Sequence, residues 1–157
     1  VVPDRSELES MISSDLRAMS AVSEEIGRAF GAQHSLGPND FRALLLIMVA
    51  DVEGRPLTAG ELGTQLGLSS AAMTYLVERM IDSGHIRREK DASDRRKVIL
   101  RYDEHGMAVA REFFGPLGAR TSSALAEVSD ADLDAAHRVF ALLIDAMRTH
   151  YEELRLD

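Results

Sequence analysis

The sequence contains no cysteine among its 157 residues. A disulfide framework, a zinc site made of thiolates and a thiol redox switch are therefore all excluded. Neither a glycine-rich phosphate loop nor a convincing pair of nucleophile and base occurs along the chain. These absences predict a protein that is not an enzyme and that needs no cofactor.

Long apolar segments are also missing. The longest uninterrupted apolar run covers residues 43–50, whereas about 18 residues are needed to span a bilayer. The first ten residues, VVPDRSELES, are polar and acidic and do not resemble a secretory signal. We therefore expect a cytoplasmic protein with no membrane partner.

The histidines do not form a metal-binding pattern. His105 follows two acidic residues, and His137 and His150 lie in the last predicted helix, but no pair has the i, i+4 spacing of a helical zinc site. Because solvated histidines are the commoner outcome, we predict no metal site.

Residues 57–70 predict a helix-turn-helix joint. A first helix spans about residues 59–66, with Thr58 as its N-cap and Glu61 completing a capping box. Gly67 can take the left-handed conformation that ends this helix, and Ser69 or Ser70 can cap the next one. A helix, a tight turn and a second helix together make this motif.

The second helix, about residues 70–83, has two chemically different faces. Apolar side chains recur at helical spacing on the core face, at Met73, Val77, Met80 and Ile81. The other face carries small and hydroxylated side chains near the N-terminus, which allow a helix to lie deep in a DNA major groove. The candidate DNA contacts are Ser69, Ser70, Ala71, Thr74, Tyr75 and Arg79, of which Ser70, Ala71, Thr74 and Tyr75 are candidates for reading bases.

Two short strands, residues 86–90 and 98–102, follow this helix and are separated by the polar loop DASDRRK. Between residues 84 and 101 there are seven Lys or Arg against three acidic residues, a balance of +4. The whole chain has a net charge of −8, so the remainder carries −12. This concentration of basic groups in an acidic chain indicates a hairpin that meets a polyanion.

Together these motifs resemble the MarR family of winged helix-turn-helix transcription regulators. The resemblance rests on the pattern L-T-x-x-E-L-x-x-x-L-G-L-S, on the D-R-R triplet of the loop and on a following E-x-G. The residues that carry it are Leu57, Thr58, Glu61, Leu62, Leu66, Gly67, Leu68, Ser69, Thr74, Val77, Gly84, Arg88, Asp94, Arg95, Arg96 and Gly106. For the flanking helices, the resemblance rests only on their length and their order along the chain. It implies a regulator, usually a repressor, that binds double-stranded DNA.

The resemblance also implies how the hairpin works. In this family the wing aspartate orients an arginine that enters the minor groove, so Asp94 would hold Arg96 or Arg95. A carboxylate two residues away can fix a guanidinium by charge-assisted hydrogen bonds, and a fixed side chain loses less entropy on entering a narrow, negatively charged groove. The predicted DNA contacts of the wing are Arg88, Asp94, Arg95, Arg96 and Lys97.

The segments on either side of this core predict further helices. Residues 6–33 and about 130–154 carry long apolar seams, the latter capped by Ser129. Residues 38–52 are apolar on nearly all sides and predict a central buried helix, followed by a short strand at residues 55–57 that pairs with the wing. Another helix runs from about residue 103 towards residue 125. Pro116 lies inside this helix and should kink it.

The predicted fold is therefore mainly α with a small β-wing, a winged helix-turn-helix with about six helices. We expect residues 1–36 to form an N-terminal dimerisation helix, residues 37–103 the DNA-binding core and residues 104–157 the C-terminal dimerisation helices. Such long seams are hard to bury in one small chain, and the resemblance also implies a two-fold homodimer with interleaved terminal helices. The alternative is a monomer that folds these helices onto its own core.

The resemblance further implies a place for a small aromatic or anionic effector, between the DNA-binding core and the dimerisation helices. The matching residues are Phe30, His34, Phe41, Met48, Arg111 and Phe114, with His34 and Arg111 as polar anchors. Apolar residues at helical spacing are more often core than pocket, so both interpretations are open at this point.

Two functions are compatible with these observations. The first is a sequence-specific, ligand-responsive repressor that binds a pseudo-palindromic operator as a homodimer. The alternative is a winged-helix module that binds protein without sequence-specific DNA binding. The net charge of −8 favours the alternative, because an acidic body repels DNA. The arginines of the wing and the small residues of the second helix favour DNA.

Overall fold

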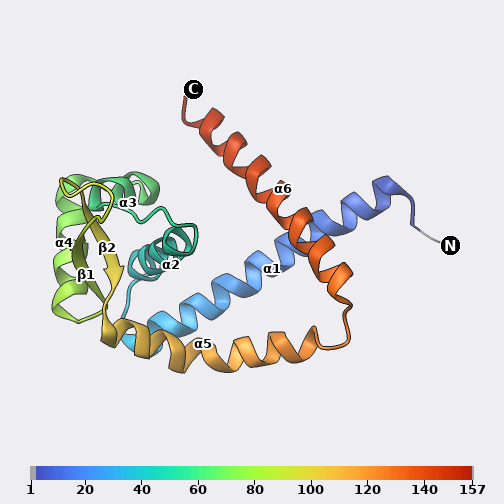
Figure 1. Cartoon of the computed structure of the whole chain (residues 1–157), viewed down its shortest axis with the longest axis horizontal. Helices are drawn as coiled ribbons and strands as arrows, with labels where there is room; N and C mark the ends of the chain where they lie inside the picture. The colour runs from blue at the N-terminus through green and yellow to red at the C-terminus, as the bar shows by residue number, and fades with distance from the viewer. Residues whose placement is uncertain (1–2, 157) are drawn as a thin grey trace. The chain divides into compact units, whose positions relative to one another are not determined.

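The computed structural model describes residues 3–156 and confirms the predicted fold class. Six helices and two strands follow one another along the described chain: α1 (Arg5–His34), α2 (Pro38–Val52), α3 (Ala59–Leu66), α4 (Ser70–Asp82), β1 (Ile86–Lys90), β2 (Val98–Tyr102), α5 (Glu104–Ala124) and α6 (Asp130–Leu154) (Figure 1). The chain divides into two compact units, the first ending at Phe113 and the second beginning at Phe114.

The helix-turn-helix forms as its capping residues predict. Thr58 Oγ1 accepts a hydrogen bond from the N–H of Glu61 at 3.2 Å, and the Glu61 carboxylate accepts one from the N–H of Thr58 at 2.8 Å. These bonds hold the pKa of Glu61 below its usual value. Gly67 ends α3 with φ +68°, a left-handed conformation that favours glycine, and Ser69 caps α4.

The core of the first unit lies between α2, α3, α4 and the two strands. Its most buried large side chains are Ile47, Leu62, Val77, Met80, Ile86, Ile99 and Leu100. The Tyr102 hydroxyl donates a hydrogen bond to the carbonyl of Leu44 at 2.9 Å, which fixes β2 against α2. Burial raises the pKa of the Tyr102 phenol well above its usual value.

Residues 38–52, predicted as a central buried helix, form α2, which in the single chain is buried along one face only. One face of α2 is buried, because α1, α3 and β2 contact it. The opposite face leaves four large apolar side chains exposed: Leu45, Met48, Val49 and Val52. Apolar composition does not identify the elements that pack against a helix. It therefore could not show which face of α2 is covered by the same chain and which face is exposed.

The wing is a two-stranded antiparallel sheet in which Ile86 pairs with Tyr102 and Lys90 with Val98. The expected strand at residues 55–57 does not form. A single bridge joins Thr58 to Ile99, and Leu100 donates its N–H to the carbonyl of Leu57 at 2.8 Å. Pro56 has no N–H to give to a ladder, and the helix starts directly after Thr58, which leaves no length for a strand.

The long helices expose much of their apolar surface. On α1 the buried residues are Gly27, Phe30 and Gly31, near its C-terminal end, whereas Leu8, Met11, Met19 and Val22 are each about half exposed. The second unit contains the rest of α5, with Pro116 inside that helix, and the whole of α6. All of α6 lies within the described residues and none of them is buried. Each seam is therefore open in the single chain.

Candidate nucleic-acid interface

Helix α4 presents a face of small and hydroxylated side chains. Its core side buries Met73, Leu76, Val77 and Met80, while Ser70, Ala71, Thr74 and Tyr75 are exposed. The Thr74 hydroxyl donates to the carbonyl of Ser70 at 2.9 Å, so its hydrogen is already used within the helix. Thr74 therefore offers its surroundings an acceptor oxygen and a methyl group, which suit an amino group of a base or the methyl of thymine.

The wing holds one arginine in a fixed position. Of the two candidates beside Asp94, Arg96 is the one that pairs with it, through its backbone N–H and Nε to Oδ1 at 3.1 Å each and through Nη2 to Oδ2 at 3.4 Å. These hydrogen bonds lower the pKa of Asp94. The Arg96 side chain is nevertheless 92% exposed. Its guanidinium is thus oriented and still accessible to a partner.

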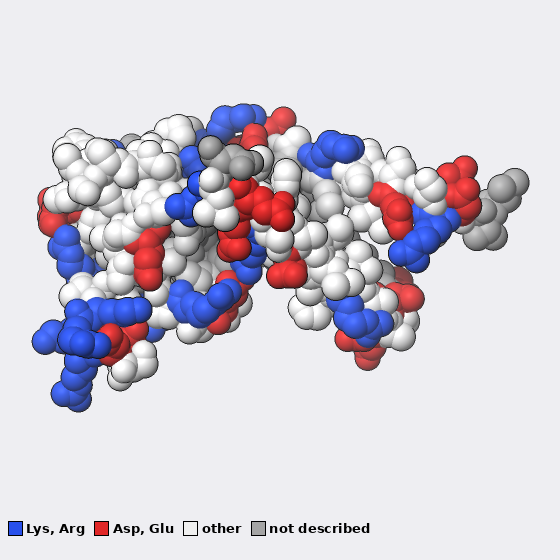
Figure 2. Space-filling model, turned by 90° about the horizontal axis from the view of Figure 1, so that it is seen from above, with Lys and Arg blue, Asp and Glu red and all other residues white. Residues whose placement is uncertain are grey.

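The rest of the loop is also ordered by its own polar groups. The N–H and the hydroxyl of Ser93 both donate to Asp91 Oδ1 at 2.8 Å, which lowers the pKa of Asp91. Lys97 donates its N–H to the carbonyl of Asp94 at 2.9 Å. Figure 2 shows Lys and Arg side chains gathered at the left of the view, over the end of the first unit that carries the wing. The side chains of Arg95, Arg96 and Lys97 are all exposed.

Two ion pairs tie α4 to its neighbours. Arg88 of β1 donates to Glu78 of α4 at 2.6 Å and lowers the pKa of that carboxyl. Arg79 of α4 donates to Asp40, a residue of α2 whose side chain is only 2% exposed. The predicted DNA contacts Arg88 and Arg79 are therefore engaged with other residues of the protein, although each side chain stays partly exposed.

Four aromatic rings meet in the first unit, where α1, α2 and α5 supply them. The Phe30 ring centroid lies 4.7 Å from that of His34, 5.7 Å from Phe41 and 5.0 Å from Phe113. Phe30 is 2% exposed. Three of the predicted effector residues are thus brought together. Of the others, Met48 and Arg111 are exposed, and Phe114 belongs to the second unit.

Comparison with known proteins agrees with this geometry. A family model described as MarR family matches residues 34–97. The uncharacterized HTH-type transcriptional regulator YcgE of Bacillus subtilis (strain 168) is 30% identical over 153 residues, which cover 96% of this chain and 96% of YcgE. The chain belongs to the MarR family of transcriptional regulators.

Solved MarR-type structures share its fold. A MarR family protein from Bacillus stearothermophilus superposes with a TM-score of 0.61 at 24% identity, over 93% of this chain and 99% of that one. S. aureus MepR in a complex with DNA gives a TM-score of 0.51 at 13% identity, over 86% and 98% of the two chains. At these identities the similarity shows only that the fold is shared. The shared fold of this MarR-family chain includes the helix-turn-helix and the wing.

Three residues of the site were not identified from the sequence. Asp40, which accepts from Arg79, and Glu78, which accepts from Arg88, are absent from the residues predicted for the site. Phe113 is adjacent to Phe114, and the predicted effector set named Phe114, whereas the ring that lies 5.0 Å from that of Phe30 belongs to Phe113. Asp40 and Arg79 are 39 positions apart, so no local pattern in this MarR-family sequence could have joined them.

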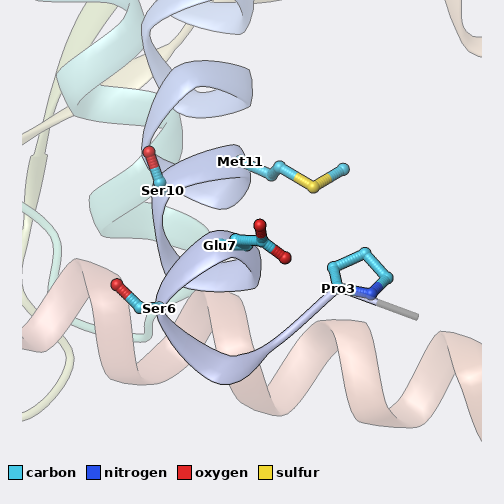
Figure 3. Close-up of a pocket in the computed structure, with 5 residues that line it drawn as sticks. All are labelled: Pro3, Ser6, Glu7, Ser10 and Met11. Carbon is cyan, nitrogen blue, oxygen red and sulfur yellow. The ribbon is translucent and has the colours of Figure 1, made fainter. Parts of the chain in front are cut away.

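Other features of the described residues do not form a site. Within residues 3–156, no group of three His, Asp or Glu lies close enough to hold a metal ion, and no helix is both long and apolar enough to cross a membrane. A hollow beside the start of α1 is lined by Pro3, Ser6, Glu7, Ser10 and Met11 (Figure 3). Its one carboxylate, Glu7, accepts a hydrogen bond from the N–H of Asp4 at 2.9 Å and so belongs to the helix cap.

Proposed function

We propose that this MarR-family regulator binds a pseudo-palindromic DNA operator as a homodimer and acts as a ligand-responsive repressor. The observation that carries the proposal is the exposed Arg96, which Asp94 orients at the tip of the wing. An oriented guanidinium suits a narrow minor groove. The Arg88–Glu78 ion pair joins the root of the wing to α4, so that one surface carries both reading elements.

Each reading element has its own role in this proposal. The N-terminal part of α4 enters the major groove, where Ser70, Ala71, Thr74 and Tyr75 meet base edges and Ser69 and Arg79 lie beside the backbone. Arg96 enters the minor groove, and the remaining basic residues of the wing, Arg88, Arg95 and Lys97, contribute charge towards phosphates. MepR, which shares the fold, has been solved in a complex with DNA.

The dimer is proposed from the open seams of the long helices. Because α6 has no buried residue, it needs a further surface to cover Phe140, Met147 and Leu154, which are exposed in the single chain. We assign residues 1–36 and 104–157 to a dimerisation region and residues 37–103 to the DNA-binding core. Two cores related by a two-fold axis would meet major grooves about 34 Å apart, at half-sites about ten base pairs apart.

The effector is proposed to be a small aromatic or anionic molecule near the ring cluster of Phe30, His34, Phe41 and Phe113. Aromatic rings in offset and edge contacts suit a flat apolar ligand. His34 and Arg111 are the polar anchors, and Met48 completes the proposed set within the first unit. MepR has also been solved bound to ethidium bromide. The proposal includes a cytoplasmic location and no catalytic activity or cofactor.

Selection from a randomised duplex DNA pool tests the proposal. The purified protein should enrich a palindrome with half-sites about ten base pairs apart, and sedimentation should give the mass of a dimer. Binding should weaken steeply with salt, with a slope of roughly −0.9 for each phosphate neutralised. If the folded protein enriches no sequence at low salt, the DNA-binding proposal is wrong.

A protein-binding winged helix is the second candidate, and the net charge of −8 is the observation that favours it. It predicts binding of a protein ligand with little dependence on salt, because no counterions are released from phosphates. A protein-binding module should enrich no DNA sequence, so the selection from randomised DNA separates the two candidate functions.

A further inference from the structure

The carboxylate of Asp40 joins the start of α2 to the helix that carries the candidate base contacts. Its Oδ2 accepts the N–H of Gly37 at 2.8 Å, which completes the first turn of α2. Its Oδ1 accepts from Nη2 of Arg79 on α4. The side chain is 2% exposed and has both oxygens occupied. A charge held this closely is a rigid anchor for whatever it binds.

Arg79, which Asp40 holds in place, in turn contacts the ring of Tyr75. The guanidinium carbon of Arg79 lies 5.5 Å from the centroid of the Tyr75 ring, within range of a cation–π contact. Tyr75 is 70% exposed and has no buried surroundings to fix its rotamer. The Arg79 side chain is itself 45% exposed, so without Asp40 it would sample several rotamers. The orientation of the Tyr75 ring therefore depends on a residue of another helix.

We infer that Asp40 is a specificity-determining positioning residue, which touches no DNA but sets the base preference of Tyr75 through Arg79. The inference rests on the proposed DNA-binding function. A ring held in one orientation meets one arrangement of base edges well and others badly, whereas a mobile ring adapts to several. Loss of the anchor should therefore reduce discrimination between base pairs more than it reduces the number of phosphate contacts.

Asp40→Asn tests this with little change of shape. The amide oxygen can still accept the N–H of Gly37, but the side chain no longer carries the charge that holds Arg79. The matched control is Asp51→Asn, which breaks another ion pair of α2, between Asp51 and Arg101 at 2.6 Å, without touching α4. Each variant is compared with the wild type by selection on randomised duplex DNA and by titration with single base-pair substitutions of the enriched site.

Asp40→Asn should reduce discrimination at one base pair of each half-site by about 2- to 10-fold, the effect of freeing one side chain, and should leave the salt slope unchanged. Asp51→Asn should keep the wild-type preference at that base pair. Tyr75→Leu should cause the same loss, and Asp40→Asn should add nothing further in a Tyr75→Leu background, because both changes act on one ring.

Equal effects of Asp40→Asn and Asp51→Asn, or additive effects of Asp40→Asn and Tyr75→Leu, would overturn the inference. Should Asp40→Asn not fold, the double variant Asp40→Asn/Arg79→Gln removes both charges and leaves two amides that can pair, and it should show the same loss of discrimination. A wild-type protein that enriches no DNA sequence would instead refute the proposed function itself, and the role of Asp40 with it.

Discussion

Asp94 and Arg96 form a fork at the tip of the wing, in which one carboxylate accepts both the backbone N–H and the guanidinium of a residue two positions later. The backbone of Asp94 is held within the same turn, because its carbonyl accepts the N–H of Lys97 at 2.9 Å. The guanidinium is therefore oriented before any partner arrives. Ordering this long side chain in advance reduces the entropy lost on binding.

Arg96→Ala should weaken operator binding by about 1–3 kcal/mol, the range for a specific arginine contact with DNA. Arg96→Lys keeps the charge but not the planar fork, and should recover only part of the loss. Fluorescence anisotropy with a labelled operator at fixed salt measures both. Unchanged affinity of the alanine variant would remove the wing tip from the mechanism.

Thr74→Ala should change base preference more than salt dependence. Because the hydroxyl hydrogen is already donated to Ser70, the side chain can meet a base through its oxygen or its methyl group. We expect a loss of about 1 kcal/mol for the preferred base pair, the lower end of the cost of one mismatch, with an unchanged salt slope. Thr74→Ser, which keeps the hydroxyl, and Thr74→Val, which keeps a methyl, tell the two contacts apart. A smaller salt slope with unchanged preference would identify Thr74 as a phosphate contact.

Two glycines should respond differently to alanine. At Gly67 the backbone has φ +68° and the added Cβ would meet no atom within 4 Å, so the loss comes from strain alone, about 1–2 kcal/mol. At Gly106 the Cβ would lie 2.1 Å from the carbonyl oxygen of His85, and the loss should be about 3 kcal/mol or more. Urea denaturation at equal protomer concentration measures both. An equal loss at the two positions would contradict the close packing of α5 against His85.

His85 should make the protein less stable in mild acid. Burial lowers its pKa, and His105 and His34 lower it further, although Asp40 opposes the shift. The unfolded chain, with an ordinary pKa of about 6.5, therefore takes up the proton first, so stability falls as pH drops below that value. Above it His85 is neutral in both states and contributes no pH dependence.

His85→Asn tests the pH dependence, because asparagine can keep the 2.8 Å contact of Nδ1 with the Ser83 hydroxyl but cannot be protonated. Its unfolding free energy should fall less than that of the wild type between pH 7 and pH 5.5. His137→Asn, on the exposed surface of α6, is the matched control and should behave as the wild type. Parallel pH profiles for all three proteins would show that His85 does not cause the acid sensitivity.

Much of the fold was predictable because its signals are local. A capping box spans three residues, a left-handed glycine acts at one position, and an amphipathic helix repeats within a few turns. For this reason α3 and both strands have the predicted bounds, and α4 ends one residue earlier than predicted. The same holds for Asp94 and Arg96, whose separation of two residues lies within one turn of the loop. The strand expected at residues 55–57 does not form, because Pro56 has no N–H to donate and the cap of α3 already begins at Thr58.

By itself, therefore, the sequence determined the order of the helices, the helix-turn-helix, and the basic wing on an acidic chain. Each follows from the conformational preferences of nearby residues or from composition. Only the tertiary structure decided that Asp40 binds Arg79, that Phe113 joins Phe30 in the ring cluster, and that one face of α2 is left open. These relationships depend on which surfaces meet after the chain has folded. Hydrophobic contacts and ion pairs form between residues that are close in space. The spacing of residues in the sequence does not show which distant residues become neighbours after folding.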